Sequence, residues 1–122
     1  MPTVEIPPVE WGTFFQSFNL VHGGWLCTLE VVSPAIGAQT RARNQPFVGI
    51  SADRDPGGAS ICVILGQPKD NQVSHSIDAP EHVWVKRTAE GADEALEIEA
   101  GEMKTLITFR VAAMPDTVDG IA

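Results

Sequence analysis

Residues 25–32 read WLCTLEVV, and every second side chain from Trp25 to Val31 is apolar. Side chains of a β-strand point to alternate faces, so this spacing places one apolar face toward a core. The same rhythm, interrupted by turn residues about every ten positions, continues as far as Val111. The sequence therefore predicts a fold built mainly of short β-strands.

Turn-forming residues divide this pattern into further strands. Pro46 is expected to end the second strand, and the breakers at 53–58 separate the third from the fourth. Residues 92–100 have helical propensity, but the alternation of Leu96 and Ile98 with glutamates favours a strand. The strands expected after the first cover 38–43, 47–52, 60–65, 73–77, 82–88, 92–100 and 105–111.

These strands should pair antiparallel, because no segment between them is long and helical enough to connect parallel neighbours. We expect a mainly β protein of the α+β class, with about seven or eight strands arranged as a small barrel or a two-layer sandwich. The chain of 122 residues has no linker, repeat or low-complexity run, which predicts a single domain over 1–122. Residues 112–122 are expected to form a loop or a single turn.

An aromatic stripe near the N-terminus predicts one helix from Pro8 to His22, stopped by Gly23 and Gly24. Such a stripe is typical of a packing face, so we expect the helix to cover the sheet or one end of the barrel. The residues that form the stripe are Trp11, Phe14, Phe15, Phe18 and Val21.

Composition restricts the class of partner. The net charge of −8 disfavours binding to nucleic acid or to an anionic membrane. The basic pairs Arg41/Arg43 and Lys86/Arg87 are interpreted as solvated surface. Cys27 and Cys62 lie in apolar strand patterns and no signal peptide or membrane span is visible, so we expect a soluble cytoplasmic protein with free thiols.

Possible metal ligands gather in one segment, which contains His75, Asp78, Glu81 and His82 around an expected turn. Two imidazoles and two carboxylates would suit zinc if they converged. The spacing matches no recognised metal motif, and His75 shares a face with apolar residues, which favours a hydrogen-bonded core histidine. We therefore assign no metal, cofactor or catalytic residue, and keep these four side chains, together with Trp84, as candidates for a ligand site.

Two other features could carry a contact. Trp84 shares a face with His82 and Lys86, so it is either core or an exposed aromatic beside polar groups. The acidic stretch lacks the spacing of a calcium loop and is interpreted as a solvated strand face, with Lys104 or Arg110 pairing across the last hairpin. Its carboxylates are Glu90, Asp93, Glu94, Glu97, Glu99 and Glu102.

Six blocks in this order carry a family likeness: 24–26 (GWL), 36–39 (IGAQ), 49–53 (GISAD), 74–77 (SHSI), 90–99 (EGADEALEIE) and 118–121 (VDGI). Together they resemble a family of short bacterial proteins described as a domain of unknown function, family 5335. The likeness extends over nearly the whole chain and implies a bacterial, single-domain, cytoplasmic protein. It brings no activity, cofactor or catalytic residue. In that family a histidine suits position 75 but is not typical of position 82.

Three hypotheses follow. The first is a non-enzymatic binding or regulatory module that contacts a protein or a small ligand. The second is a small metal-dependent enzyme or ligand binder that uses His75 with Asp78, Glu81 or His82. The third is a structural homo-oligomer that uses the edge at 38–43 or the face of Trp84. A deep pocket in which these side chains converge would favour the second hypothesis, and a shallow surface with His75 enclosed by aliphatic side chains would exclude it.

Overall fold

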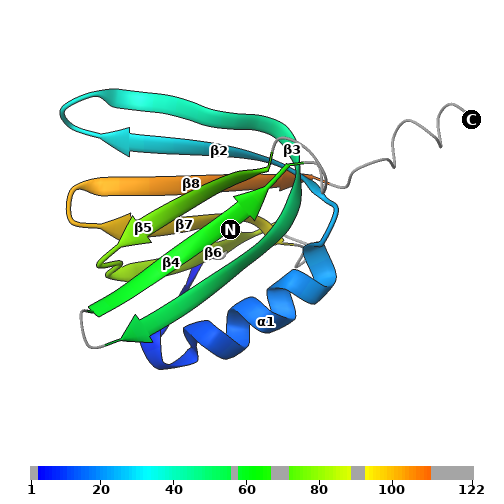
Figure 1. Ribbon diagram of the computed structural model, residues 1–122, viewed down its shortest axis with the longest axis horizontal. Coiled ribbons are helices and arrows are strands. Elements are labelled where there is room, and N and C mark those ends of the chain that lie inside the picture. Colours follow the sequence, from blue (N-terminus) through cyan, green and yellow to red (C-terminus); the bar gives the residue numbers. More distant parts are fainter. Residues whose placement is uncertain (1–2, 56–57, 67–71, 89–92, 111–122) are drawn as a thin grey trace, which may run out of the picture.

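The computed structural model describes residues 3–55, 58–66, 72–88 and 93–110. Within these ranges the chain forms eight strands, one α-helix and one short 3-10 helix (Figure 1). In chain order the elements are β1 (Thr3–Ile6), η1 (Pro8–Glu10), α1 (Trp11–His22), β2 (Leu26–Ser33), β3 (Gly37–Asp55), β4 (Gly58–Leu65), β5 (Val73–Asp78), β6 (His82–Arg87), β7 (Asp93–Ala100) and β8 (Met103–Arg110).

The strands form one antiparallel system in the order β1-β6-β7-β8-β2-β3-β4-β5. The first half of β3 pairs with β2, and its second half pairs with β4, so the sheet folds over into two layers. β1 and β5 stand at the two ends of this order and do not pair with each other, so the sheet is not closed into a barrel. The expected antiparallel fold with one N-terminal helix is confirmed, and its arrangement is consistent with a two-layer sandwich.

The long strand β3 corrects one expectation. Segments 38–43 and 47–52 were expected as two strands ended by Pro46, whereas the chain runs through Pro46 without a break. Proline lacks a backbone N–H, which a strand tolerates where it leaves one neighbour for another. Pro46 lies at that point, opposite Leu26 of β2, while its carbonyl accepts a hydrogen bond from the N–H of Gly66 (2.8 Å).

The N-terminal region also differs from expectation. β1 was not expected, and the α-helix begins at Trp11 because Pro8–Glu10 form a 3-10 helix. Val21, assigned to the aromatic stripe, is exposed, and His22 is buried in its place. The buried positions on α1 are Trp11, Phe15, Phe18 and His22, a spacing of four, three and four residues that follows one face of the helix.

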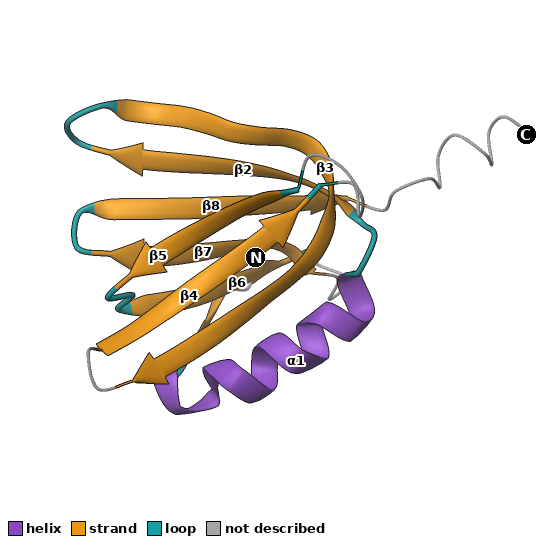
Figure 2. Cartoon of the chain, viewed as in Figure 1, coloured by secondary structure: helices purple, strands orange, loops and turns teal. Residues whose placement is uncertain are grey.

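α1 runs alongside the second half of β3, as Figures 1 and 2 show. The Asn19 side chain attaches it there: its Nδ2 donates to the carbonyl of Ile50 (3.0 Å), and its Oδ1 accepts from the N–H of Ile50 (2.9 Å). A neighbouring strand would offer the backbone of Ile50 the same two partners. The helix thus covers the edge of the second layer at β3, while no described strand pairs with the other edge, at β5.

One hydrophobic core fills the space between the layers. It joins Phe15 and Phe18 of α1 with Leu29 and Ile107 of the first layer and Ile61 of the second. Cys27 also lies in this core, and its burial raises the pKa of its thiol to about 12. Cys62 is only partly buried, and both cysteines are free. Among the described residues, no helix has the length and apolarity needed to cross a bilayer.

Candidate binding cleft at the edge of β5

A cavity of about 220 Å³ lies between β5 and the end of the β7–β8 hairpin. Four successive residues, His75 to Asp78, line it on the β5 side. Successive side chains of a strand point to opposite faces, so a cavity that touches all four runs along the edge of the strand. The opposite wall consists of Ala100, Met103 and Thr105.

Two polar side chains face this cavity from the inner side of the sheet. His75 lies opposite Val63, which is fully buried, and Thr105 is only 3% exposed. The hydroxyl of Thr105 makes no hydrogen bond with the described part of the chain. Burial and the nearby positive charge of Arg41 lower the pKa of His75, so its imidazole is held neutral. The cavity therefore offers a neutral imidazole and a hydroxyl beside apolar walls.

The four candidate ligands of the sequence do not all meet. His75 and Asp78 line the cavity. The carboxylate of Glu81 instead accepts a hydrogen bond from the N–H of Gly101 (3.3 Å), and His82 lies elsewhere, on the outer face of the first layer. Within the described ranges no group of three or more His, Cys, Asp or Glu side chains could hold a metal ion.

On that outer face, His82 contacts β1. Its Nδ1 lies 2.7 Å from Oε2 of Glu5, and this hydrogen bond raises the pKa of the imidazole. Trp84, the next residue on the same face, lies between Glu5 and Glu97 on the neighbouring strands. It is neither core nor fully exposed: the side chain is half-buried, and its indole N–H is covered without a hydrogen-bond partner.

Most of the acidic stretch behaves as expected of a solvated strand face. Lys104 pairs with Glu99 across the last hairpin (4.0 Å), and Lys86 pairs with Glu97 (3.6 Å). Asp93 differs, because it takes part in a partly buried contact with Arg87. Arg87, interpreted as solvated surface, is 34% exposed and forms this contact. Glu90 lies outside the described residues.

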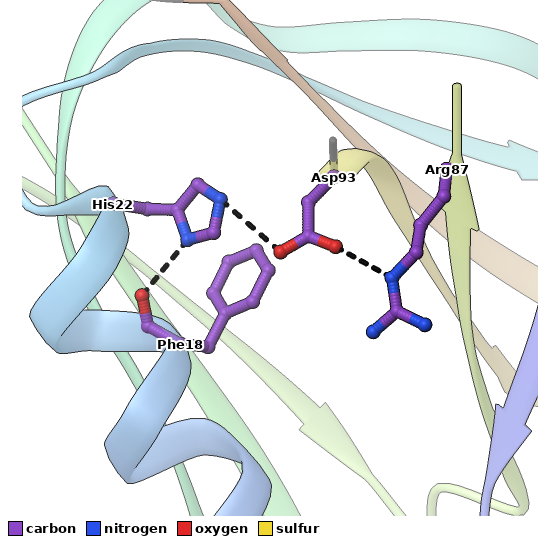
Figure 3. Close-up of polar contacts among 4 residues, drawn as sticks. All are labelled: Phe18, His22, Arg87 and Asp93. Carbon is purple, nitrogen blue, oxygen red and sulfur yellow. Dashed lines mark hydrogen bonds and ion pairs between the residues drawn. The ribbon is translucent and has the colours of Figure 1, made fainter. Parts of the chain in front are cut away.

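Sequence reasoning missed a polar cluster at the end of α1 (Figure 3). Nδ1 of His22 donates to the carbonyl of Phe18 (2.9 Å), and its Nε2 lies 3.4 Å from Oδ2 of Asp93. Oδ1 of Asp93 accepts a hydrogen bond from Nε of Arg87 (2.9 Å). The helical spacing of His22 from Phe18 could have indicated its burial, but the contact with Asp93 depends on the tertiary fold.

This cluster fixes the helix rather than opening a site. His22 is 1% exposed, and its ring stacks on that of Phe18 with centroids 3.9 Å apart. The ring of Trp25 lies against another side of the imidazole, with the two ring centroids 4.5 Å apart. The cluster therefore joins the end of α1 to β6 and β7 of the first layer.

A second cavity, of about 550 Å³, lies where α1 begins. Its lining is mostly small and apolar, and Asp53 is the charged side chain among the described residues that form it. The indole N–H of Trp11, which also lines it, already donates to the carbonyl of Ile6 (2.8 Å). The cavity beside His75, with two polar groups free to bind, is the better candidate for recognition.

The fold and the cleft define a small two-layer antiparallel β protein with one helix along its edge. The chain belongs to a family of unknown function, DUF5335, whose model matches residues 3–117. No curated protein and no solved structure matches it. The family assignment confirms the resemblance.

Proposed function

We propose that this protein is a non-enzymatic binding module that takes up an extended segment of another protein as an added strand beside β5. The observation that supports this most directly is the open edge of β5 with a cavity along it. An edge strand presents a row of unpaired backbone N–H and C=O groups, which is a template for pairing with another chain.

The alternation of backbone hydrogen bonds along β5 identifies the groups that face this open edge. The N–H of Ala79 donates to the carbonyl of Ala59, so the odd-numbered residues of β5 turn their backbone toward β4. Ser74, Ser76 and Asp78 therefore direct their N–H and C=O groups away from β4. The contact between Asn19 and Ile50 agrees with the same alternation on the other side of β4.

The size of the cavity favours a protein segment over a cofactor or a drug-sized ligand. Pockets that enclose such ligands measure about 300–1,000 Å³. The cavity here, about 220 Å³, is smaller. It suits one side chain of a strand whose backbone lies along β5.

The charges around the cleft favour a basic segment. Asp78 lines the cavity, and Glu81 and Glu102 occupy the two turns beside it, so the acidic side chains outnumber the positive charge of Arg41 that acts on His75. The chain as a whole carries a net charge of −8. Lys or Arg residues on either side of the bound strand would complement this field and accelerate association.

A metal-dependent enzyme has weaker support. Of the four candidate ligands only His75 and Asp78 line the cavity, which is fewer than the three protein ligands that a catalytic zinc site uses.

We also propose that the protein is bacterial and cytoplasmic and that it has no nucleic-acid partner. The free cysteines and the negative net charge support it.

Substitution of Ser76 tests strand addition. Proline at this position removes an N–H on the open edge and leaves the ladder with β4 intact, whereas Ser76→Ala keeps the N–H and serves as the matched control. The probe is a phage-displayed library of random linear peptides selected on the wild-type chain. We expect the enriched peptides to bind Ser76→Ala as tightly as wild type and Ser76→Pro at least about tenfold more weakly.

Amide hydrogen exchange locates the bound peptide, which should protect the N–H groups of Ser74, Ser76 and Asp78. Thermal melting of both variants establishes that they fold. Strand addition is ruled out if no peptide is enriched above an uncoated control, or if the enriched peptides bind Ser76→Pro with unchanged affinity.

A further inference from the structure

We infer that the cavity beside β5 receives a tyrosine side chain from the bound segment, with Lys or Arg residues flanking it. This inference rests on the strand addition proposed above. It names the side chain that the cleft selects and the residue, Thr105, that recognises its hydroxyl.

Thr105 provides the first argument. A hydroxyl that lines a cavity can bond to water in the free protein, and a ligand that displaces this water must replace the hydrogen bond. Thr105 is 3% exposed, lines the cavity and has no side-chain hydrogen bond to any residue that the structure describes. A ligand atom that donates to it or accepts from it would complete this site.

His75 provides the second argument for a tyrosine side chain. Its lowered pKa leaves a neutral imidazole, which has one nitrogen that donates and one that accepts. A phenol hydroxyl both donates and accepts, so it can bond to this imidazole and to the Thr105 hydroxyl. A carboxylate would meet the like charge of Asp78 as well as the positive charge of Arg41 near His75, and it can accept hydrogen bonds but donate none.

The walls and the volume fit an aromatic ring. Ile77, Ala100 and Met103 supply apolar surface, and a methionine sulfur makes favourable contacts with aromatic rings. The cavity of about 220 Å³ is large enough to admit a phenol ring. Phenylalanine would fill the same space but leave both polar groups unpaired.

The register of an added strand places that ring correctly. Residues opposite each other in a sheet point to the same face. A residue that lies opposite His75 or Ile77 of β5 therefore points inward, toward Thr105. Its neighbours in sequence point outward, where Asp78 is exposed, and basic side chains suit those positions.

A peptide series tests the inference. The probe is an extended peptide of about nine residues with lysine at both ends, alternating Val and Thr, and a central position occupied by Tyr, Phe, Glu or Ala. Affinities for the full chain are measured by calorimetry. We expect the Tyr peptide to bind about tenfold more tightly than the Phe peptide, and the Glu and Ala peptides to bind more weakly still.

Thr105→Val, which keeps the shape and removes the hydroxyl, should reduce the preference for Tyr over Phe, because the phenol keeps its bond to His75 alone and the Phe peptide no longer leaves a Thr105 hydroxyl unpaired. Thr108→Val is the matched control, because Thr108 is exposed on the opposite face of β8 and should not alter either affinity. Melting curves establish that both variants fold.

The two proposals fail in different ways. If all four peptides bind equally and lose affinity with Ser76→Pro, strand addition stands and the tyrosine site is wrong. A tyrosine preference that Thr105→Val leaves unchanged, or tightest binding of the Glu peptide, also overturns the tyrosine site. If none of the four binds although peptides enriched from the library do, the tyrosine site is wrong and strand addition stands.

Discussion

His75 and His82 lie only seven positions apart, yet their surroundings shift their protonation in opposite directions. His75 faces the cleft, where burial and Arg41 lower its pKa below the ordinary value of 6.5. His82 is exposed on the outer face, where the hydrogen bond to Glu5 raises its pKa above 6.5. Proton uptake at each residue is therefore linked to folding with opposite sign.

The pH dependence of stability should show both effects. Below pH 6.5 the unfolded chain protonates His75 before the folded chain does, so this residue makes stability fall as the pH decreases. Above pH 6.5 the folded chain keeps the proton on His82 longer, so its stabilising contribution, present below that pH, is lost as the pH rises. We expect His75→Gln to flatten the acid side of the curve and His82→Gln to flatten the alkaline side.

Urea denaturation from pH 5 to pH 8 measures these slopes, with each variant as the control for the other. If the free energy of unfolding of wild type and of His75→Gln changed in parallel with pH below 6.5, the cleft would not lower the pKa of His75.

Single residues also show how far the sequence could predict the site. His75 and Asp78 were recognised because their types and positions are local facts. Thr105 was not, because its side chain meets β5 only when the second layer folds over the first. Glu81 and His82 were grouped with His75 on sequence distance alone, and the turn at Ala79 and Pro80 leads them to other partners.

At the scale of elements, α1 is attached to both layers. Asn19 binds the backbone of β3 in the second layer, and His22 reaches Asp93 of β7 in the first. Gly49 lies against the Asn19 amide, where a Cβ atom would be 3.6 Å from its Nδ2. The helix therefore connects the two layers as well as covering their apolar core.

Asn19→Ala should destabilise the protein by about 1–3 kcal/mol, because it leaves the N–H and C=O of Ile50 without their partners. Gln16→Ala, at an exposed position of the same helix, should change stability by less than about 0.5 kcal/mol. Chemical denaturation measures both. Equal stability of the two variants would mean that water replaces Asn19 at no cost.

The elements also define what the sequence pattern can and cannot show. Alternation predicted seven of the strands, because each buries one face. It did not predict the continuity of β3, since Pro46 has the usual meaning of a strand end and is tolerated only where β3 changes partners. β1 was missed because its side chains are mostly exposed and its place beside β6 is a long-range contact.

At the scale of the whole molecule, the net charge of −8 acts on stability and on binding in opposite ways. Repulsion among unpaired carboxylates opposes the compact state, and the described surface ion pairs contribute little to offset it. The same field attracts a basic segment to the cleft. Salt screens both effects, since the Debye length falls from about 30 Å at 0.01 M to about 8 Å at 0.15 M.

Raising NaCl over this range should therefore increase the melting temperature by a few degrees while weakening the binding of the lysine-flanked peptides several-fold. Calorimetry on one preparation provides both readouts. An affinity that does not change with salt would exclude charge attraction as a source of specificity.

The bend of β3 has a consequence far from itself. Hydrogen-bonded strands lead from β8 through β2, β3 and β4 to β5. The two ends of this series, the β7–β8 hairpin and β5, are the walls of the cleft. At one end the two walls are joined directly, because the N–H of Glu81 donates to the carbonyl of Glu99 (2.7 Å). The two walls are otherwise connected through β3, so Pro46, where this strand leaves β2 for β4, belongs to the support of a cleft whose lining does not include it.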